Sequence, residues 1–328
     1  MLLKQIPEDF VVRERLELEF SEHGEWAYYL LRKRNIAAFD ALTTISRVLG
    51  LRESAISIAG LKDRRAITEQ HIAIKRGPPR SIKLGALELR FLGRGKRALC
   101  AGQHAGNSFE IVVRGIDSVP NPKRYVLNYF DIQRFSSTNA KLGKALLKGE
   151  FSYVAQWFSA QHKDVRAALA SRPRDFVGAL TLLPRKLLRL CVHAYQAFLW
   201  NATVSKLLSR LPHTSLGSLA IPLETPEQRD IPIVGFDFVA SSDELGQIIS
   251  ELLKAENIEA ANFISRPLPW LSAESRTRPM LVELSELAIG QLEPDELNPK
   301  KSKIRLSFVL PPGAYATMAV AQLFSASA

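Results

Sequence analysis

The chain has 328 residues, of which 46% are hydrophobic and 23% charged, and it carries a net charge of +11 with a pI near 9.7. These values are ordinary for a globular protein of two domains, and the positive charge favours a polyanionic partner. Cys100 and Cys191 indicate neither a disulfide framework nor a zinc site and are compatible with the cytoplasm. The first residues do not resemble a signal peptide, and no run of about 18 apolar residues predicts a membrane span.

The N-terminal third predicts strands and one helix. Alternating or short apolar runs predict strands at 10–14, 26–33, 56–59, 68–75, 86–92 and 109–114. Apolar residues at helical spacing predict a helix over 39–49, which should end at Gly50.

The middle of the chain predicts helices. Residues 139–208 have a helical pattern with breaks at Pro173 and Pro184, and its last helix should direct four side chains into a core, namely Ala194, Phe198, Leu199 and Val204. Residues 211–269 mix short strands and turns with one helix near 243–253. A strand at 305–310 and a helix at 316–324 follow.

Charge is unevenly distributed along the chain. Lysine and arginine are concentrated in 71–100, 123–148 and 163–189, whereas 221–260 is acidic. A sided distribution of this kind is typical of nucleic-acid-binding proteins. It favours an RNA-binding protein over one with scattered, solvated charges.

One carboxylate lies among cations in the stretch Gly60–Gln70. Asp63 is flanked by Lys62, Arg64 and Arg65, and it follows an apolar run that predicts a strand, so we expect it on a loop. Nearby positive charge favours the ionised form of a carboxyl group, which suits a nucleophile or base that acts on a polyanion. The alternative is a surface turn with local ion pairs.

Six segments, in this order, resemble the motifs of the TruD family of tRNA pseudouridine synthases. They are 4–14 (KQIPEDFVVRE), 60–70 (GLKDRRAITEQ), 106–114 (GNSFEIVVR), 128–135 (NYFDIQRF), 194–201 (AYQAFLWN) and 310–317 (LPPGAYAT). Together they extend over nearly the whole chain, so the combined resemblance is far more specific than any one segment.

The resemblance implies an α+β fold with a discontinuous catalytic domain. That domain, a mixed and largely antiparallel sheet with flanking helices, would comprise residues 1–136 and 289–328. An inserted α/β domain particular to the family would comprise residues 137–288.

The resemblance also implies the chemistry. The enzyme would convert a uridine of tRNA, expected at position 13 in the D arm, to pseudouridine as a monomer without metal or cofactor. Asp63 would be the essential group, as nucleophile on the ribose or as base at its 2′ position, and one carboxylate fits poorly with glycoside hydrolysis, which uses a pair. The positions that match substrate-contacting residues are Phe10, Asn107, Phe109 and Tyr315, with Lys4 at the site carboxylate or on RNA.

Other classes of protein stay open at this point. A non-catalytic RNA-binding protein or tRNA chaperone on the same scaffold is the main alternative, and a nuclease would need a carboxylate cluster or phosphate loop that the sequence lacks. Three residues depart from the family pattern: Asp131 and Ser136 replace glycines, and Trp26 replaces a histidine. An Asp in left-handed backbone would carry some energetic cost.

Overall fold

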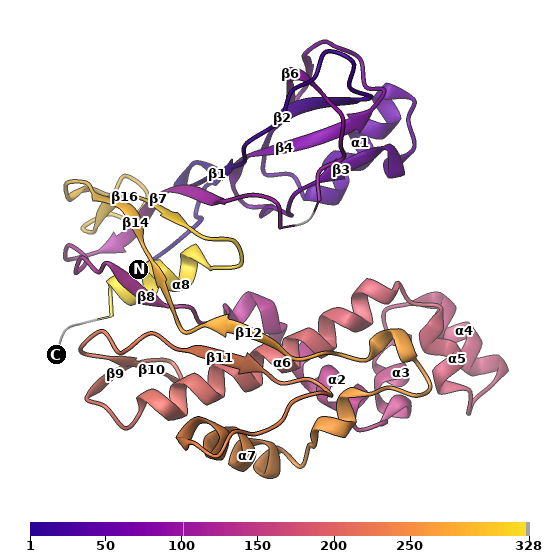
Figure 1. Cartoon of the computed structure of the whole chain (residues 1–328). Helices are drawn as coiled ribbons and strands as arrows, with labels where there is room; N and C mark the ends of the chain where they lie inside the picture. Colours follow the sequence, from indigo (N-terminus) through magenta and orange to yellow (C-terminus); the bar gives the residue numbers. More distant parts are fainter. Residues whose placement is uncertain (101, 326–328) are drawn as a thin grey trace. The chain divides into compact units, whose positions relative to one another are not determined.

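The computed structural model describes residues 1–100 and 102–325, with side chains for all of these except 132–137. The chain forms two compact units (Figure 1). Unit 1 comprises Met1–Val126 and Val282–Phe324, and unit 2 comprises Leu127–Leu281. The two-stranded pair β8 (Tyr125–Leu127) and β13 (Leu281–Glu283) contains both points at which the chain passes from one unit to the other.

Unit 1 is built on one ten-stranded sheet with the order β14-β16-β7-β1-β4-β2-β6-β5, to which β15 and β3 add at β16 and β4. The strands are β1 (Phe10–Arg15), β2 (Trp26–Arg34), β3 (Ile56–Ile58), β4 (Ile67–Lys75), β5 (Ile82–Leu84), β6 (Leu87–Gly95), β7 (Gly106–Ile116), β14 (Ser285–Ile289), β15 (Glu293–Pro294) and β16 (Ser302–Leu310). Only β1 and β4 pair in parallel among the described strands of this sheet. The predicted α+β fold with a mixed, largely antiparallel sheet is confirmed.

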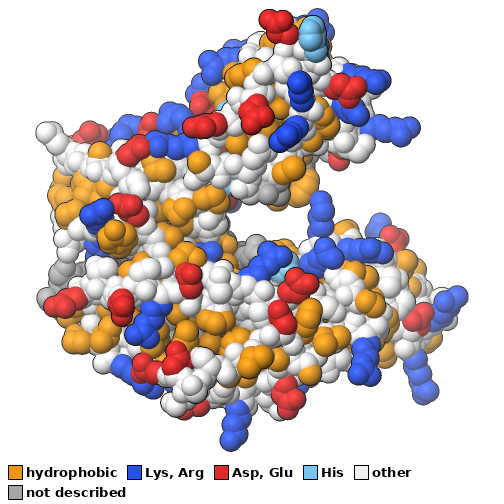
Figure 2. All heavy atoms as spheres, in the orientation of Figure 1, with side chains coloured by type: hydrophobic (Ala, Val, Ile, Leu, Met, Phe, Trp, Pro, Cys, Tyr) orange, Lys and Arg blue, Asp and Glu red, His pale blue; other side chains and the backbone are white. Residues whose placement is uncertain are grey.

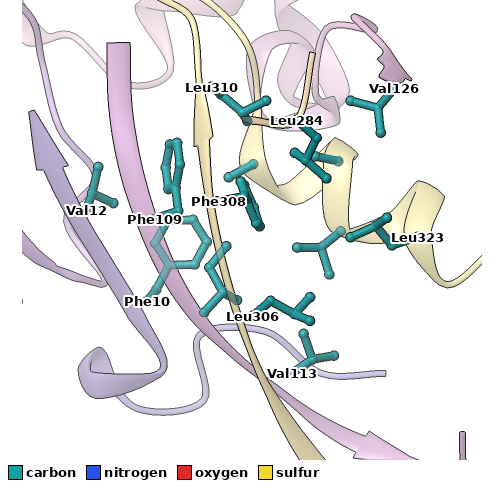
Figure 3. Close-up of a cluster of buried hydrophobic side chains, with 14 of the residues drawn as sticks. Phe10, Val12, Phe109, Val113, Val126, Leu284, Leu306, Phe308, Leu310 and Leu323 are labelled. Carbon is teal, nitrogen blue, oxygen red and sulfur yellow. The ribbon is translucent and has the colours of Figure 1, made fainter. Parts of the chain in front are cut away.

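Two helices of unit 1 supply the apolar partners of the sheet. Helix α1 (Ala38–Leu49) packs through Ala41 and Ile45 against β2, β4 and β6. It ends, as predicted, at Gly50, whose φ of 63° lies in the left-handed region that glycine adopts at little cost. Helix α8 (Ala316–Leu323) packs against β7, β14 and β16, and Figure 3 shows this cluster with Phe10, Phe109 and Phe308 at its centre.

Unit 2 is mainly helical. Its helices are α2 (Ile132–Leu147), α3 (Phe151–Ser159), α4 (Lys163–Ser171), α5 (Phe176–Thr181), α6 (Arg185–Leu208) and α7 (Glu244–Glu256), and its strand pairs are β9 (His213–Leu216) with β10 (Leu219–Pro222) and β11 (Asp230–Ile233) with β12 (Arg276–Pro279). Several Lys and Arg side chains project from the part of this unit that contains α4 and α5 (Figure 2).

The helical predictions for unit 2 need two corrections. The first helix begins at Ile132, and not near residue 139. Phe198 on α6 does not face the core, because its side chain is 38% exposed, whereas Ala194, Leu199 and Val204 are buried as predicted.

Asp131 does not adopt a positive φ, so the expected cost of replacing a glycine there does not arise. The side chain of Ser136 lies outside the described residues. In the described parts of the chain, no helix is long and apolar enough to cross a membrane.

Candidate active site

Asp63 lies on the loop between β3 and β4, as predicted, and its side chain is 45% exposed. Its ion-pair partner is the lysine that the family resemblance placed at the site carboxylate or on RNA, and not one of the cations beside Asp63 in the sequence. Lys4, which is distant in sequence, places Nζ 2.6 Å from Asp63 Oδ2. Lys62 instead pairs with Glu14, and Arg64 and Arg65 form no ion pair with any residue that the structure describes. The carboxylate is therefore oriented by one lysine from the N-terminal segment and keeps an exposed side.

Lys4 is fixed by the segment around it. Its φ of 58° is left-handed, a conformation that costs a non-glycine residue roughly 1–2 kcal/mol. Leu2 holds one side of this turn, because its backbone N–H donates to Arg114 O at 2.7 Å and its carbonyl accepts from Arg114 N at 3.0 Å. The Lys4 ammonium also lies 4.1 Å from the centre of the Phe10 ring. The strained turn thus directs the lysine to Asp63.

A buried ion cluster anchors the same segment. The guanidinium of Arg114 contacts Asp9 at 2.8 Å, Asp295 at 2.9 Å and Glu296 at 3.1 Å. Removing one member of such a cluster leaves an uncompensated charge in the protein interior, which is strongly destabilising. Asp9 and Arg114 belong to two of the six motifs, and the structure gives both a role in fixing the segment that carries Lys4.

The Asp63 loop lies over a group of polar side chains on one face of the sheet. Thr68 is paired with Lys33 on β2 and with Val12 on β1, and Glu14 on β1 is paired with Asn107 on β7. Directly paired residues point to the same face of a sheet, and the face alternates along each strand. We call these five residues the polar strip: Glu14, Lys33, Thr68, Gln70 and Asn107. On the same face, apolar clusters lie on both sides of it.

Three side-chain contacts hold the Asp63 loop on the polar strip. Lys33 is fully buried, and its Nζ donates to the backbone carbonyl of Asp63 at 2.6 Å and to that of Ile36 at 2.8 Å. Gln70 Nε2 donates to Gly60 O at 3.2 Å. The third contact has its donor on the loop, because Lys62 Nζ donates to Oε1 of Glu14 in the polar strip at 2.8 Å. The backbone of the catalytic candidate is therefore set by buried groups beneath it.

Burial changes the ionisation of this strip. It lowers the pKa of Lys33 to about 8, a shift that the negative charge of Asp63 opposes and the positive charge of Lys62 increases. Burial acts to raise the pKa of Glu14, but the hydrogen bond from His71 and the attraction of Lys62 outweigh it, and the net shift is downward. At neutral pH the strip therefore holds the buried carboxylate of Glu14 together with the ammonium group of Lys33.

Four buried polar atoms near the loop have no hydrogen-bond partner among the described residues: Thr68 Oγ1, Gln70 Oε1, His104 Nδ1 and Asn107 Oδ1. Three of them belong to the polar strip. His104 lies beside the loop, since a Cβ atom at Gly60 would be 3.4 Å from its ring. Buried polar atoms in native proteins nearly always have a hydrogen-bond partner. Four such atoms without a partner near one loop therefore indicate where water or a substrate would bind.

The predicted substrate-contacting residues fall into two groups. Phe10 and Phe109 are 2% and 6% exposed, and their rings meet edge to face with centroids 6.0 Å apart in the apolar cluster of Figure 3. Asn107 and Tyr315 are only partly buried. Asn107 is paired with Leu310, the last residue of β16, and Tyr315 follows five residues later as the N-cap of α8. A stacking role for the two phenylalanines stays a prediction.

The polar strip contains four residues that the sequence interpretation did not single out: Glu14, Lys33, Thr68 and Gln70. Lys33 had a recognisable signal, because alternation along β2 places it on the same face as Leu31 and Tyr29, which are buried. A charged residue on the apolar face of a strand indicates a paired or functional group. No group of three or more His, Cys, Asp or Glu side chains in the described part of the chain could hold a metal ion.

Comparison with known proteins assigns the family. The family model described as tRNA pseudouridine synthase D (TruD) matches residues 1–168, 160–220 and 228–323. A crystal structure of a TruD protein from Methanosarcina mazei matches 98% of this chain and 93% of its own, with a TM-score of 0.71 and 26% identity. The chain belongs to the TruD family.

Two curated relatives agree with this assignment. The tRNA pseudouridine synthase D of Aquifex aeolicus is 28% identical over 382 residues, a match that covers 98% of this chain and 97% of the relative. A protein of Methanosarcina acetivorans, named "Probable tRNA pseudouridine synthase D", is 28% identical and is matched over 96% of this chain and 90% of the relative.

Proposed function

We propose that this protein converts a uridine of tRNA to pseudouridine, with Asp63 as the essential group and position 13 of the D arm as the target. The observation that carries the proposal is the geometry of Asp63, an exposed carboxylate on a loop held by buried side chains and oriented by Lys4 at 2.6 Å. A surface turn with incidental ion pairs would not need this support. Unit 1 is proposed as the catalytic domain and unit 2 as the inserted domain.

The reaction requires that the bond between C1′ and N1 of the uridine breaks and that a bond between C1′ and C5 forms, while C5 loses a proton to solvent and N1 gains one, so that substrate and product are isomers. Asp63 can serve it in two ways. Its oxygen can attack C1′ and form a covalent intermediate, or it can remove the proton at the 2′ position. Lys4 orients the carboxylate in both routes. The hydrogen bond from Lys33 fixes the backbone of Asp63, so the carboxylate starts from one position.

The target base must leave its stack before it can reach Asp63, and the enzyme must compensate for that cost by contacts to the base. Asn107 offers an unpartnered Oδ1 that can accept a hydrogen bond from the base, and the partly buried ring of Tyr315 can stack on it. Phe10 and Phe109 would support the site from the apolar core. The excess of basic residues would bind the phosphates of the tRNA.

The decisive experiment replaces Asp63 by Asn, which keeps the size of the side chain and removes its charge. Tritium released from tRNA that contains 5-tritiated uridine measures the reaction, and filter binding measures affinity. We expect no turnover by Asp63→Asn and a dissociation constant close to that of the unsubstituted protein. Asp40→Asn is the matched control, because Asp40 is exposed in the first turn of α1.

The outcomes separate the candidate functions. A non-catalytic RNA-binding protein would release no tritium even without a substitution, although it would bind tRNA. Turnover by Asp63→Asn at the level of Asp40→Asn would remove Asp63 from the mechanism. Mapping of pseudouridines in tRNA from cells with and without the gene tests position 13. We also propose that the protein acts as a monomer in the cytoplasm, where its exposed Cys100 would stay reduced.

A further inference from the structure

Unit 2 contains a pocket that the proposed reaction does not use. It has a volume of about 330 Å³ and lies between α6, the end of β11, the start of β12 and residues 271–274. Sites for small molecules have volumes of about 300–1,000 Å³, so one nucleotide is a suitable size for it. All of its lining residues belong to unit 2.

One face of α6 forms a wall of this pocket. Arg189, Val192, His193 and Gln196 line it and are spaced three and four residues apart, which places them on one side of the helix. Gln196 is buried, and its Nε2 donates to Val234 O at 2.8 Å. This hydrogen bond ties α6 to the segment after β11 and fixes the wall.

Two motifs of the family resemblance meet at the pocket, although neither contributes to the site around Asp63. Phe130 belongs to the motif 128–135 and lines the pocket, and Asn201 belongs to the motif 194–201. The Asn201 side chain accepts a hydrogen bond from Phe130 N and donates one to Phe130 O, each at 2.9 Å. The Phe130 ring packs edge to face on Trp200, with centroids 5.5 Å apart, and the guanidinium of Arg278 lies over the ring at 4.0 Å from its centre, so only the part of the ring that faces the pocket can contact a ligand. The aromatic wall is therefore rigid before any ligand binds.

Arginines supply the charge at the pocket. Arg276 is exposed, and its side chain has no ion pair or hydrogen bond with the residues that the structure describes. Arg189 donates through Nε to Trp270 O at 2.9 Å, and a guanidinium has five N–H donors, so others stay available. Glu274 is also exposed at the pocket and can accept a hydrogen bond from a base.

Apolar and aromatic walls beside guanidinium groups match the chemistry of a nucleotide. A base has flat apolar faces and polar edges, whereas its phosphate takes paired hydrogen bonds from arginine. We propose that this pocket binds one nucleotide of the tRNA substrate, with the base against Phe130 and the phosphate at Arg276 and Arg189. The inference rests on the proposed function, because that function supplies the tRNA.

The test uses the full chain with Asp63→Asn, so that tRNA is bound and not modified. Arg276→Gln removes one charge from the pocket, and Lys254→Gln removes one charge from α7, where the Lys254 side chain is exposed and has no partner among the described residues. Fluorescence anisotropy with a labelled tRNA transcript gives the dissociation constant at several salt concentrations. We expect Arg276→Gln to raise it roughly tenfold, which corresponds to one charge-assisted hydrogen bond.

The salt dependence supplies a second measure. Loss of one phosphate contact should reduce the slope of log affinity against log salt by about one in Arg276→Gln, and Lys254→Gln should leave it unchanged. If Arg276→Gln and Lys254→Gln changed the dissociation constant and the salt slope equally, only the total charge of the protein would matter, and the proposal would be overturned. Glu274→Gln removes a negative charge from the same pocket and should not weaken the binding of tRNA. A loss of affinity in Arg276→Gln alone would then follow from the loss of a positive charge.

Two further results separate the possible sources of failure. Equilibrium dialysis with a nucleoside 5′-monophosphate tests for a free nucleotide as the true ligand. Saturation by the free nucleotide, together with unchanged tRNA affinity in Arg276→Gln, would overturn the role in tRNA binding. If the unsubstituted chain forms no pseudouridine, the proposed function fails. If it forms pseudouridine while Arg276→Gln binds tRNA normally, only the pocket assignment fails.

Discussion

Two neighbouring regions on one face of the sheet in unit 1 use the same strands for different purposes. Around Phe109 the face is apolar, with Phe10 and Phe308 packed against its ring at centroid distances of 6.0 Å and 5.5 Å. Around Lys33 the face is polar, and its side chains contact the backbone of the Asp63 loop. The apolar region stabilises the fold, whereas the polar strip fixes the position of one loop.

The row of directly paired residues Lys33, Thr68, Val12, Phe109 and Phe308 crosses both regions. Hydrophobic burial is non-directional, so the apolar part of this row specifies that the strands pack but not where a loop lies. Hydrogen bonds are directional and costly to leave unmade in the interior. The polar strip can therefore specify the loop position, at some cost in stability.

The largest expected effect concerns the apolar region. Phe109→Ala and Phe308→Ala each remove a buried ring and should each lower the free energy of unfolding by about 3–5 kcal/mol. Denaturant unfolding measures this loss, and Phe308→Ala serves as the matched control because the family resemblance assigns Phe308 no contact with substrate. At low temperature, where both variants are folded, the single-turnover rates of Phe109→Ala and Phe308→Ala should be similar to each other.

A different result would move Phe109 into the substrate site. Stacking of an aromatic ring on a base contributes about 1–3 kcal/mol, or roughly ten- to hundredfold in rate. Such a loss in Phe109→Ala but not in Phe308→Ala, with both folded, would show that the ring contacts the base during the reaction.

The next effect concerns the polar strip. Lys33→Met keeps an unbranched side chain and removes the hydrogen bonds to the carbonyls of Asp63 and Ile36. We expect kcat to fall roughly hundredfold, because a small misplacement of a reacting group can cost that much. The melting temperature should change little, because the loss of two hydrogen bonds to buried carbonyl groups opposes the gain from no longer burying an ammonium group. A fall in melting temperature with a normal kcat would make Lys33 a purely structural residue.

The sequence predicted most of the elements because their periodicity is local. The strand around Phe109 and the helix that ends at Gly50 depend on residues within a few positions of one another, and the motif around Asp63 identified its loop. The partner of Asp63, Lys4, was suggested by the family resemblance and not by the residues beside Asp63, because Lys4 reaches it only after the N-terminal segment is fixed by Arg114. Local charge suggested Lys62, which the fold directs to Glu14.

Residues whose role depends on strand register were also missed. Lys33 was overlooked although it alternates onto the apolar face of its strand, because lysine is rarely buried and the carbonyl group that it contacts belongs to Asp63, 30 residues away. The error at Phe198 has a related cause. Helix α6 is apolar on several sides, and only its tertiary neighbours decide that Ala194 faces inward and Phe198 outward.

The smallest effect is a pH dependence that distinguishes the two regions without changing the packing of either. The pKa of Lys33 is about 8 in the folded protein, against an ordinary value of 10.5, and the charged groups that act on it are Asp63 and Lys62. As pH rises through 8, folded Lys33 loses its proton while the unfolded chain keeps it up to about 10.5. The unfolded state then binds more protons, so the contribution of this group to stability rises between these pH values.

Activity should change in the opposite direction over the same range. A neutral amine is a weaker donor than an ammonium group, so the hold on the Asp63 backbone weakens, and kcat should fall about two- to fivefold between pH 7 and pH 9. Lys33→Met should show neither the fall in kcat nor the rise in unfolding free energy, because it has no proton to lose. A pH profile of kcat in Lys33→Met with the same alkaline fall would assign that fall to another group. Parallel changes in kcat and stability in the unsubstituted protein would contradict the separation of roles between the polar strip and the apolar core.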